Sequence, residues 1–198
     1  MPKAGLNTER VVVAGAELAD EAGIAGVSLA ALAARLGVKP PTLYKHVASL
    51  QDLRYRIAIL AMTEVGDQLR DALQGRSGSD ALAAAFTAMR HYIVAHPGRY
   101  AATTGARFAG PDDPLFIASN RVVNSIRAVL AGYGIPGDRL DHTVRALRCS
   151  VHGFALLQVS DGFQWGNDQD ESFDWMIRLT DLGLRSISGR PGPAGRQD

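Results

Sequence analysis

Apolar residues recur at intervals of three and four along almost the whole chain, which is the spacing of amphipathic helices. No segment keeps the alternation of apolar and polar residues that is typical of a half-buried strand. We therefore predict an all-α protein of about nine helices. These helices are expected near residues 8–23, 29–36, 40–47, 50–73, 80–95, 98–107, 115–132, 138–160 and 171–188.

The residues at the expected helix ends agree with this division. Thr8 and Ser28 are predicted N-caps, because their hydroxyl oxygens can accept hydrogen bonds from backbone N–H groups of the first turn. Gly23 and Gly37 are predicted to end the first two helices, where a permissive residue is often needed. The proline pair at residues 40–41 fits the first turn of the third helix, where a missing N–H is tolerated.

The first three helices have the layout of a helix-turn-helix. Two short helices are separated by a tight turn at Gly37, and a long helix follows. Leu32 and Leu43 are expected to bury the inner faces of the two short helices. The second short helix then presents an outward set of residues: Lys39, Pro40, Thr42, Tyr44, Lys45 and His46. Small or flat side chains can approach base edges, while hydroxyl, imidazole and ammonium groups can reach phosphates, so this surface favours DNA binding.

Residues 29–53, LAALAARLGVKPPTLYKHVASLQDL, resemble the DNA-binding domain of the tetracycline-repressor (TetR) family. The core LGV-x-x-PTLY-x-HV is closer to the tetracycline repressors themselves than to the commoner family pattern. The resemblance extends back through the first helix and covers about 55 residues. The segments HPGRY and SVHGFALLQVSDGF, followed by DQDESF, are similar to one class of TetR-family ligand-binding domains.

The resemblance implies roles for individual residues of the helix-turn-helix. Those nearest the base edges would be Lys39, Pro40, Pro41 and Thr42, and those binding phosphates would be Ser28, Thr42, Tyr44, Lys45 and His46. Two positions depart from the pattern: Ala30 replaces an arginine that reads guanine in tetracycline repressors, and Leu50 replaces a phosphate-binding lysine. The operator sequence is therefore not transferable, and affinity is expected to be lower unless Arg54 or Arg56 compensates.

Composition adds an uneven distribution of charge. The chain has 198 residues, 46% hydrophobic content and a formal net charge of +1, which taken alone argues against a nucleic-acid partner. However, residues 35–56 hold five Lys or Arg residues against Asp52 alone, while residues 161–181 hold six acidic residues against Arg178 alone. The small net charge therefore results from cancellation between two segments. One is the basic helix-turn-helix region, which we call the reading head, and the other is the acidic segment of residues 161–181.

Several classes of protein are not favoured by the sequence. No apolar run approaches the roughly 18–20 residues of a membrane helix, and the N-terminus lacks the apolar stretch of a signal peptide, so we expect no membrane partner and a cytoplasmic location. Patterns for metal sites, phosphate-binding glycine loops and serine nucleophile elbows are missing, so we expect no enzyme, metal or cofactor. The single cysteine, Cys149, lies in an apolar helical stretch and is expected to be a buried packing residue.

The last two predicted helices indicate a homodimer. Each carries an apolar stripe, and the final helix is apolar on more than one face, which a monomer surface rarely tolerates. The predicted interface comprises Val151, His152, Gly153, Phe154, Phe173, Ile177, Thr180 and Leu184. A ligand-sensing or pH-sensing role is the alternative for the histidine in this set. Two recognition helices about 34–36 Å apart would then enter successive major grooves of a palindromic operator.

Apolar and amide side chains on the middle helices are candidates for an effector pocket. They are Phe86, Met89, Tyr92, Tyr100, Phe108, Phe116, Asn120 and Asn124. The alternative is that about half of them are core residues of an ordinary helical bundle. Phe163 and Trp165, before the last helix, are candidates for closing either a pocket or the dimer seam.

We predict a helix-turn-helix DNA-binding domain in residues 1–50, a helical ligand-binding and dimerisation domain in residues 51–188, and a disordered tail in residues 189–198. In the resembling family, a ligand that prefers the non-binding conformation releases the protein from DNA. The resemblance therefore implies a homodimeric repressor that binds a double-stranded DNA operator and is released by a small apolar or aromatic effector. The alternative is a helical adaptor, or a small-molecule-binding protein, that does not bind DNA.

Overall fold

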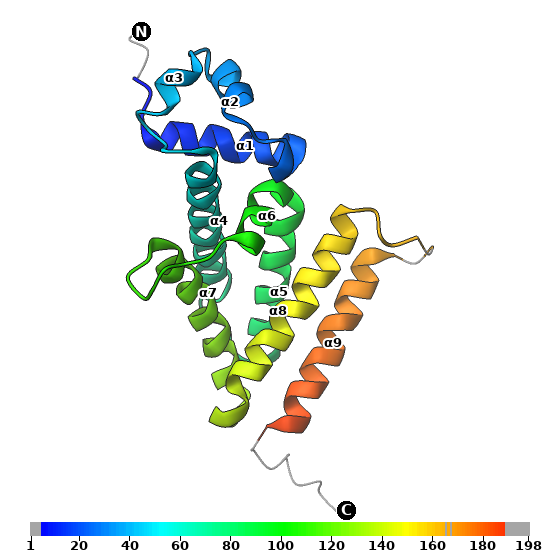
Figure 1. Cartoon of the computed structure of the whole chain (residues 1–198). Helices are drawn as coiled ribbons and strands as arrows, with labels where there is room; N and C mark the ends of the chain where they lie inside the picture. Colours follow the sequence, from blue (N-terminus) through cyan, green and yellow to red (C-terminus); the bar gives the residue numbers. More distant parts are fainter. Residues whose placement is uncertain (1–4, 165, 167, 189–198) are drawn as a thin grey trace, which may run out of the picture. The chain divides into compact units, whose positions relative to one another are not determined.

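The computed structural model describes residues 5–164, 166 and 168–188, and within these ranges the chain forms helices joined by turns, without strands (Figure 1). The helices are α1 (Thr8–Gly26), α2 (Leu29–Leu36), α3 (Pro40–Leu43), α4 (Leu50–Ala72), α5 (Gly78–Ala95), α6 (Pro97–Gly105), α7 (Pro114–Ala131), α8 (Gly137–Val159) and α9 (Gln169–Ile187). The all-α prediction is confirmed. Trp165 and the predicted disordered tail, residues 189–198, lie outside the described residues.

The helices divide into two compact units that differ from the division predicted at residue 50. The first unit takes the residues up to Val65 together with Ala95–Asn120, and the second takes Gly66–Val94 together with the residues from Arg121 onward. The boundaries fall inside α4 and α7 and at the end of α5. None of the helices in the described ranges is both long enough and apolar enough to cross a bilayer.

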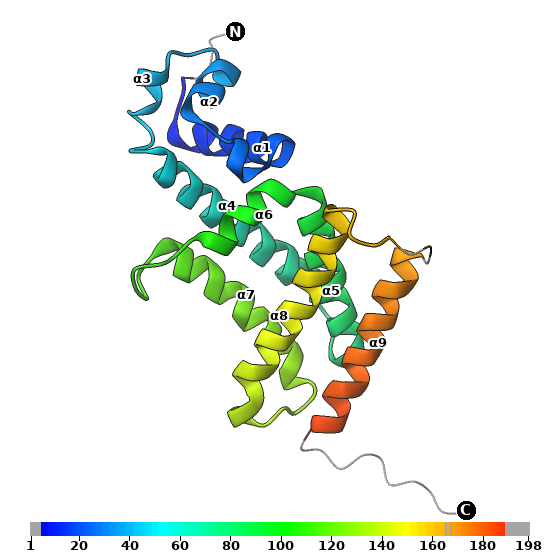
Figure 2. The ribbon, with the colours of Figure 1, turned by 45° about the vertical axis from the view of Figure 1, so that its right-hand side comes forward.

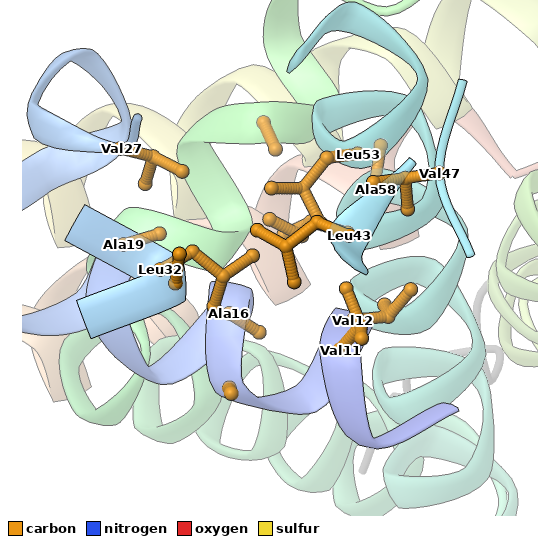
Figure 3. Packing of buried hydrophobic residues seen from close by; sticks show 14 of the residues in the cluster. Val11, Val12, Ala16, Ala19, Val27, Leu32, Leu43, Val47, Leu53 and Ala58 are labelled. Atoms are coloured by element: carbon orange, nitrogen blue, oxygen red, sulfur yellow. The ribbon is translucent and has the colours of Figure 1, made fainter. Parts of the chain in front are cut away.

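The first unit is built around α1, whose apolar face packs against α2, α3, α4 and α6 (Figure 3). Leu32 of α2, Leu43 of α3 and Leu53 of α4 are each fully buried in this core, and α6 contributes Ala102. Burying such leucine side chains is worth about 1.5–3 kcal/mol each, so this shared core is what holds the helix-turn-helix together. The helix-turn-helix therefore depends on α4 and α6 for its core.

Two details of the first unit correct the predicted helix ends. The N-cap of α1 is Asn7, whose Oδ1 accepts a hydrogen bond from the backbone N–H of Arg10 at 2.8 Å, and Thr8 is the first helical residue. Gly23 has a left-handed φ of 73° and kinks α1, which then continues to Gly26. The kink agrees with the predicted need for a permissive residue there, although the helix does not end at it.

The second unit contains α5, α8 and α9, of which α8 and α9 run antiparallel and side by side (Figures 1 and 2). Tyr133, in the turn before α8, donates a hydrogen bond to Asp181 of α9 at 2.5 Å. Burial and this bond to a carboxylate raise the pKa of the Tyr133 phenol well above its usual value. The tyrosine therefore stays protonated and keeps the turn attached to the last helix.

Candidate DNA-binding surface

The helix-turn-helix is fixed by local interactions that follow from its sequence. Ser28 caps α2 by accepting a hydrogen bond from the N–H of Ala31 at 3.1 Å, as predicted. At the other end Gly37 has a left-handed φ of 66°, and the N–H of Val38 bonds back to the carbonyl of Ala33. This ending turns the chain sharply, so that α3 starts immediately after the turn.

The recognition helix is shorter than predicted. Pro40 and Pro41 occupy its first turn as expected, but α3 ends at Leu43, and residues 44–46 form a turn. The N–H of His46 bonds to the carbonyl of Leu43, three residues back, which tightens the chain. Val47 is buried and anchors the far side. The surface is therefore a single helical turn with a tight extension.

The predicted DNA-contacting residues fall into two groups by exposure. Five are exposed: Lys39, Pro40, Pro41, Tyr44 and Lys45. The remaining three, Ser28, Thr42 and His46, are half-buried. Tyr44 leaves 58% of its surface exposed, although an aromatic side chain at a helix end usually packs against its own protein. All eight lie on α3, its N-cap, its extension or the N-cap of α2, and their contacts with DNA remain a prediction.

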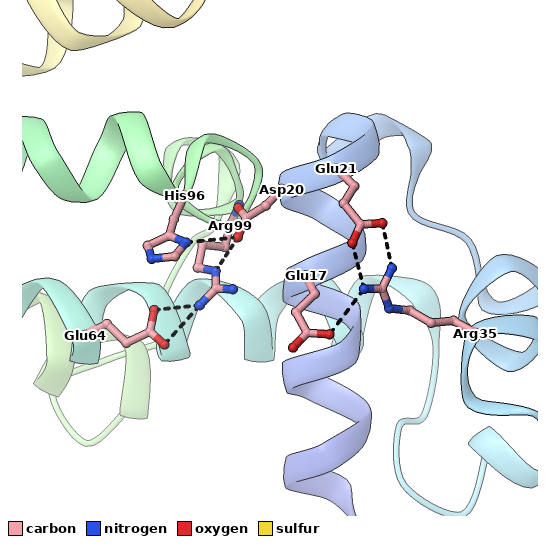
Figure 4. Close-up of polar contacts among 7 residues, drawn as sticks. All are labelled: Glu17, Asp20, Glu21, Arg35, Glu64, His96 and Arg99. Atoms are coloured by element: carbon pink, nitrogen blue, oxygen red, sulfur yellow. Dashed lines mark hydrogen bonds and ion pairs between the residues drawn. The ribbon is translucent and has the colours of Figure 1, made fainter.

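Counting charges by segment overestimated the basic surface, because some of the cations are neutralised in the fold. Arg35 of α2 forms ion pairs with Glu17 and Glu21 of α1, at 3.3 and 2.7 Å (Figure 4). Arg56 pairs with Asp52 at 3.0 Å, and the carboxylate of Asp52 also accepts the N–H of Ala48 to start α4. Pairs between exposed side chains contribute little stability, but they occupy cations that the sequence count treated as available.

Three cations of residues 35–56 have no ion pair among the described residues: Lys39, Lys45 and Arg54. Nη2 of Arg54 lies 3.5 Å from the carbonyl of Val27, directly before the N-cap of α2, and its Nε is buried without a hydrogen-bond partner. The sequence could not distinguish Arg54 from Arg56, since they lie two residues apart in one helix. The structure distinguishes them, because Arg56 pairs with Asp52 whereas Arg54 lies beside the carbonyl of Val27.

The structure scatters the predicted effector-binding residues. Phe86, Met89 and Tyr92 are buried on α5 in the second unit, and Tyr100 is buried on α6 in the first. Among the others, only Phe108 and Phe116 are described in contact, edge to face with ring centroids 5.1 Å apart. Phe108 is 52% exposed, and Asn120 and Asn124 are exposed as well. The burial on α5 fits the alternative of core residues, and an effector site at these residues remains a prediction.

Three members of the predicted dimer interface are buried inside their own chain. Val151, Phe173 and Leu184 are covered by their own chain and belong to the core of the second unit. Their spacing identified an apolar stripe correctly, but spacing does not say which chain covers it. The large apolar side chains that are exposed lie instead on the opposite face of α9, at Trp175, Leu179 and Leu182. Leu157 of α8 is exposed as well.

The other predicted interface residues, His152, Gly153, Phe154, Ile177 and Thr180, are half-buried. Cys149 is exposed on α8, so the prediction that it is a buried packing residue was wrong. It lies two residues from Val151, which on a helix turns it away from the core face. A groove of about 500 Å³ runs between α8 and α9 and is lined by residues that include Leu147, Thr180 and Leu184.

Sequence reasoning missed Arg90 of α5, which is only 8% exposed. Its guanidinium lies over the rings of Phe154 and Phe173, 5.4 and 4.6 Å from their centroids. Nε bonds to Gln158 at 2.8 Å, and Nη2 pairs with Asp170 at 2.6 Å. One signal could have revealed it: this arginine occupies the apolar face of α5, between Met89 and Ile93.

Comparison with known proteins agrees with this architecture. A model described as "Bacterial regulatory proteins, tetR family" matches residues 11–54, and one described as "Tetracyclin repressor-like, C-terminal domain" matches residues 82–180. The uncharacterized HTH-type transcriptional regulator YobS of Bacillus subtilis (strain 168) is 34% identical over 184 residues, which cover 92% of this chain and 95% of YobS.

Two solved structures share the fold at lower identity. A TetR variant from Acinetobacter baumannii AYE, in complex with minocycline, has a TM-score of 0.71 at 21% identity and covers 94% of this chain and 100% of its own. ActR of Streptomyces coelicolor, in complex with actinorhodin, has a TM-score of 0.71 at 20% identity with the same coverage. The chain thus belongs to the TetR family of bacterial helix-turn-helix transcriptional regulators.

Proposed function

We propose that the chain is a ligand-responsive repressor that acts in the cytoplasm as a homodimer, without enzymatic activity. It binds a palindromic double-stranded operator through α3 of each copy and is released by a small apolar or aromatic effector. In this proposal residues 1–50 read DNA, while residues 51–188 bind the effector and the second copy. The observation that carries the proposal is the exposed surface of α3 and its extension.

Three features make that surface suited to a duplex. Lys39 and Lys45, on either side of α3, have no ion pair among the described residues and are therefore available to phosphates. Pro40 and Pro41 present apolar rings that can contact a thymine methyl group. Tyr44 is exposed with its hydroxyl available to a phosphate oxygen. The surface thus combines backbone positioning with base contact.

The homodimer is supported by the exposed apolar face of α9. Trp175, Leu179 and Leu182 follow one another at intervals of four and three residues, so they share one side of the helix, and Leu182 is 64% exposed. Large apolar side chains gathered on one exposed face mark an interaction surface. A second copy that covers this face would place two reading heads on one duplex, as a palindromic operator requires.

The effector class follows from family analogy alone. A TetR variant and ActR, which share this fold, have crystal structures in complex with minocycline and with actinorhodin. The buried aromatic residues Phe86 and Tyr92 on α5 would suit such a ligand if α5 lines the pocket. We therefore propose an aromatic effector, to be sought by screening compounds for release of bound DNA.

Binding to DNA is tested with a duplex that the protein selects from a random library. Fluorescence anisotropy then compares the wild-type protein with Tyr44→Ala and Lys45→Ala, which should weaken binding to selected and unrelated duplexes alike. The matched control is Arg76→Ala, which removes the same charge at an exposed position in the turn between α4 and α5, outside residues 1–50. Unchanged affinity in both variants, or failure to select any duplex at low salt, would favour the adaptor over the regulator.

A further inference from the structure

The segment that forms α3 and its extension lacks the side chains that identify bases by paired or charge-assisted hydrogen bonds. Residues 36–46 contain no arginine, asparagine, glutamine, aspartate or glutamate. In the major groove, carboxamides read adenine through two hydrogen bonds, carboxylates accept from cytosine, and guanidinium groups donate to guanine. None of these three groups is therefore available on the α3 surface.

The guanidinium group nearest in the sequence is bound to its own chain. Arg35 has the only guanidinium in residues 28–46. Its Nη1 and Nη2 each donate to a different carboxylate oxygen of Glu21 at 2.7 Å, and Nη2 also lies 3.3 Å from Glu17 (Figure 4). A pair of parallel bonds of this kind fixes the plane of the guanidinium. Arg35 would have to leave both carboxylates of α1 to read a guanine.

The backbone of the first turn of α3 does not supply hydrogen-bond donors either. Pro40 and Pro41 have no N–H group, and the N–H of Thr42 bonds to the carbonyl of Lys39 at 2.9 Å. Both prolines are exposed, and each presents the CH₂ groups of its ring. Because the rings also fix the backbone, this turn loses little conformational freedom on binding. The exposed centre of the surface is therefore rigid and apolar.

Two cations lie on either side of this apolar centre. Lys39 precedes the prolines and Lys45 follows α3, and both are exposed without an ion pair in the described part of the chain. In a major groove, phosphates lie along both sides of the base edges, so this order of charge and apolar surface matches the groove. Only one base presents an apolar group there, which is the C5-methyl group of thymine.

We propose that the reading head recognises its operator half-sites through thymine C5-methyl groups, which contact the rings of Pro40 and Pro41 and the methyl group of Thr42. Lys39 is then the one side chain of this turn that can identify a guanine. The hydroxyl of Thr42 can donate or accept, so it does not distinguish one base from another. The inference rests on the proposed function, since it needs α3 in the major groove of a duplex.

Methyl recognition has a consequence that hydrogen-bond recognition lacks. Replacing thymine by uracil removes only the methyl group and keeps the base pair. Replacing thymine by 5-methylcytosine, paired with guanine, keeps the methyl group and changes the hydrogen-bonding groups. A protein that reads the methyl group should therefore reject uracil and accept 5-methylcytosine at the same position.

The experiment uses the full chain and a duplex that it selects from a random library. Fluorescence anisotropy compares this duplex with four altered versions. Two carry uracil in place of thymine, one in the half-sites and one only in the flanks, the second as a control for general effects of uracil on the duplex. The other two carry cytosine or 5-methylcytosine in place of the half-site thymines, each paired with guanine.

A protein variant assigns the effect to the proline rings. The double variant Pro40→Ala, Pro41→Ala keeps residues that suit a helix start but removes the ring carbons. Pro114→Ala is the matched control, because this exposed proline is likewise the first residue of a helix, α7. Thermal melting confirms that each variant is folded, and the measurements on the wild-type protein stand by themselves if the double variant is not.

One buried methyl group is worth about fourfold in affinity, so uracil in two half-sites should weaken wild-type binding by about 15-fold, and uracil in the flanks by less than about twofold. The 5-methylcytosine duplex should bind more tightly than the cytosine duplex by a similar factor. Pro114→Ala should behave as the wild type, whereas the double variant should distinguish thymine from uracil much less.

Three results would overturn the inference. They are selected half-sites without a fixed thymine, equal wild-type affinity for thymine and uracil half-sites, and a double variant that is as sensitive to uracil as the wild type. A 5-methylcytosine duplex that binds no better than the cytosine duplex would also contradict it. A wild-type protein that selects no duplex would instead reject the proposed function, and the inference with it.

Discussion

Arg56 donates a hydrogen bond from its Nε to the carboxylate of Asp52, one turn earlier in α4, at 3.0 Å. Arg54, two residues before it, has no such carboxylate among the described residues and lies beside the start of α2. The two arginines therefore form a natural pair for testing which cations reach DNA. Either substitution removes one positive charge, so the long-range electrostatic effect is matched between them.

The first prediction is that Arg54→Met weakens DNA binding more than Arg56→Met does. A cation that contacts a phosphate contributes about 0.9 to the slope of log affinity against log salt, so Arg54→Met should reduce that slope by about this amount for each copy. Arg56→Met should leave the slope nearly unchanged. Anisotropy titrations at several salt concentrations measure both slopes, and equal changes would contradict the assignment.

The second prediction concerns the buried arginine of the second unit. Arg90→Met removes two cation–aromatic contacts and two hydrogen bonds, and should lower the free energy of unfolding by about 2 kcal/mol. Arg178→Met is the matched control, because Arg178 lies over the exposed ring of Trp175 at 5.5 Å and its loss should cost less than about 0.5 kcal/mol. Urea denaturation measures the free energy of unfolding of both variants. Equal losses in Arg90→Met and Arg178→Met would contradict the prediction.

The third prediction uses two glycines of α6. Gly98→Ala should lower the free energy of unfolding by about 1–3 kcal/mol, because the new methyl group meets the backbone of Ala19 and α6 must shift. Gly105→Ala, at the other end of the same helix, meets nothing within 4 Å and should be neutral or slightly stabilising. Thermal melting of both variants measures the contrast. Two similar melting temperatures would show that the contact with Ala19 is easily relieved.

The fourth prediction is a pH dependence from His152. Burial, and then the positive charge of Arg148, lower the pKa of this imidazole below 6.5. The unfolded chain therefore takes up the proton at a higher pH than the folded chain, so the free energy of unfolding falls as the pH drops below about 6.5. In His152→Gln this part of the dependence should disappear between pH 7 and pH 5.

The control for that experiment is His91→Gln, which replaces an exposed histidine of α5. It should retain the wild-type dependence on pH. Urea denaturation at several pH values measures all three proteins. A wild-type curve that is no steeper than that of His152→Gln would show that the folded chain accommodates the charged imidazole.

The fifth prediction places the dimer interface on the outer face of α9. Leu182→Glu should shift the protein toward the monomer, because it introduces a charge among exposed apolar side chains that a second copy would cover. Gln68→Glu, an exposed position on α4, adds the same charge elsewhere and should leave the oligomeric state unchanged. Analytical ultracentrifugation distinguishes the two outcomes, and an unaffected Leu182→Glu dimer would move the interface away from this face.

The sequence predicted those features that are determined by neighbours in the chain. Ser28, Gly37 and the proline pair at residues 40–41 act within one or two helical turns, so their residue types alone predict the caps and the turn. The fold class followed from apolar spacing for the same reason. The third helix was predicted too long because its end depends on a tight turn that spacing does not reveal.

Features that join distant segments could not be predicted in the same way. Asp20 and Arg99 are 79 residues apart, and nothing in either segment indicates the other. The pairing of Arg35 with Glu17 and Glu21 was likewise invisible to a count of charges by segment. The apolar stripe through Val151 was recognised, yet its burial within one chain depends on how the helices of the second unit pack.

The neutralised arginines have a consequence for how the protein finds its operator. Affinity for arbitrary DNA comes almost entirely from unpaired cations, and the reading head keeps few of them. We expect the protein to hold random DNA only briefly and to search by repeated dissociation rather than by long sliding along the duplex. The protein would then stay bound longest at sites whose bases fit α3. Few of its copies in the cell would be bound elsewhere on the chromosome.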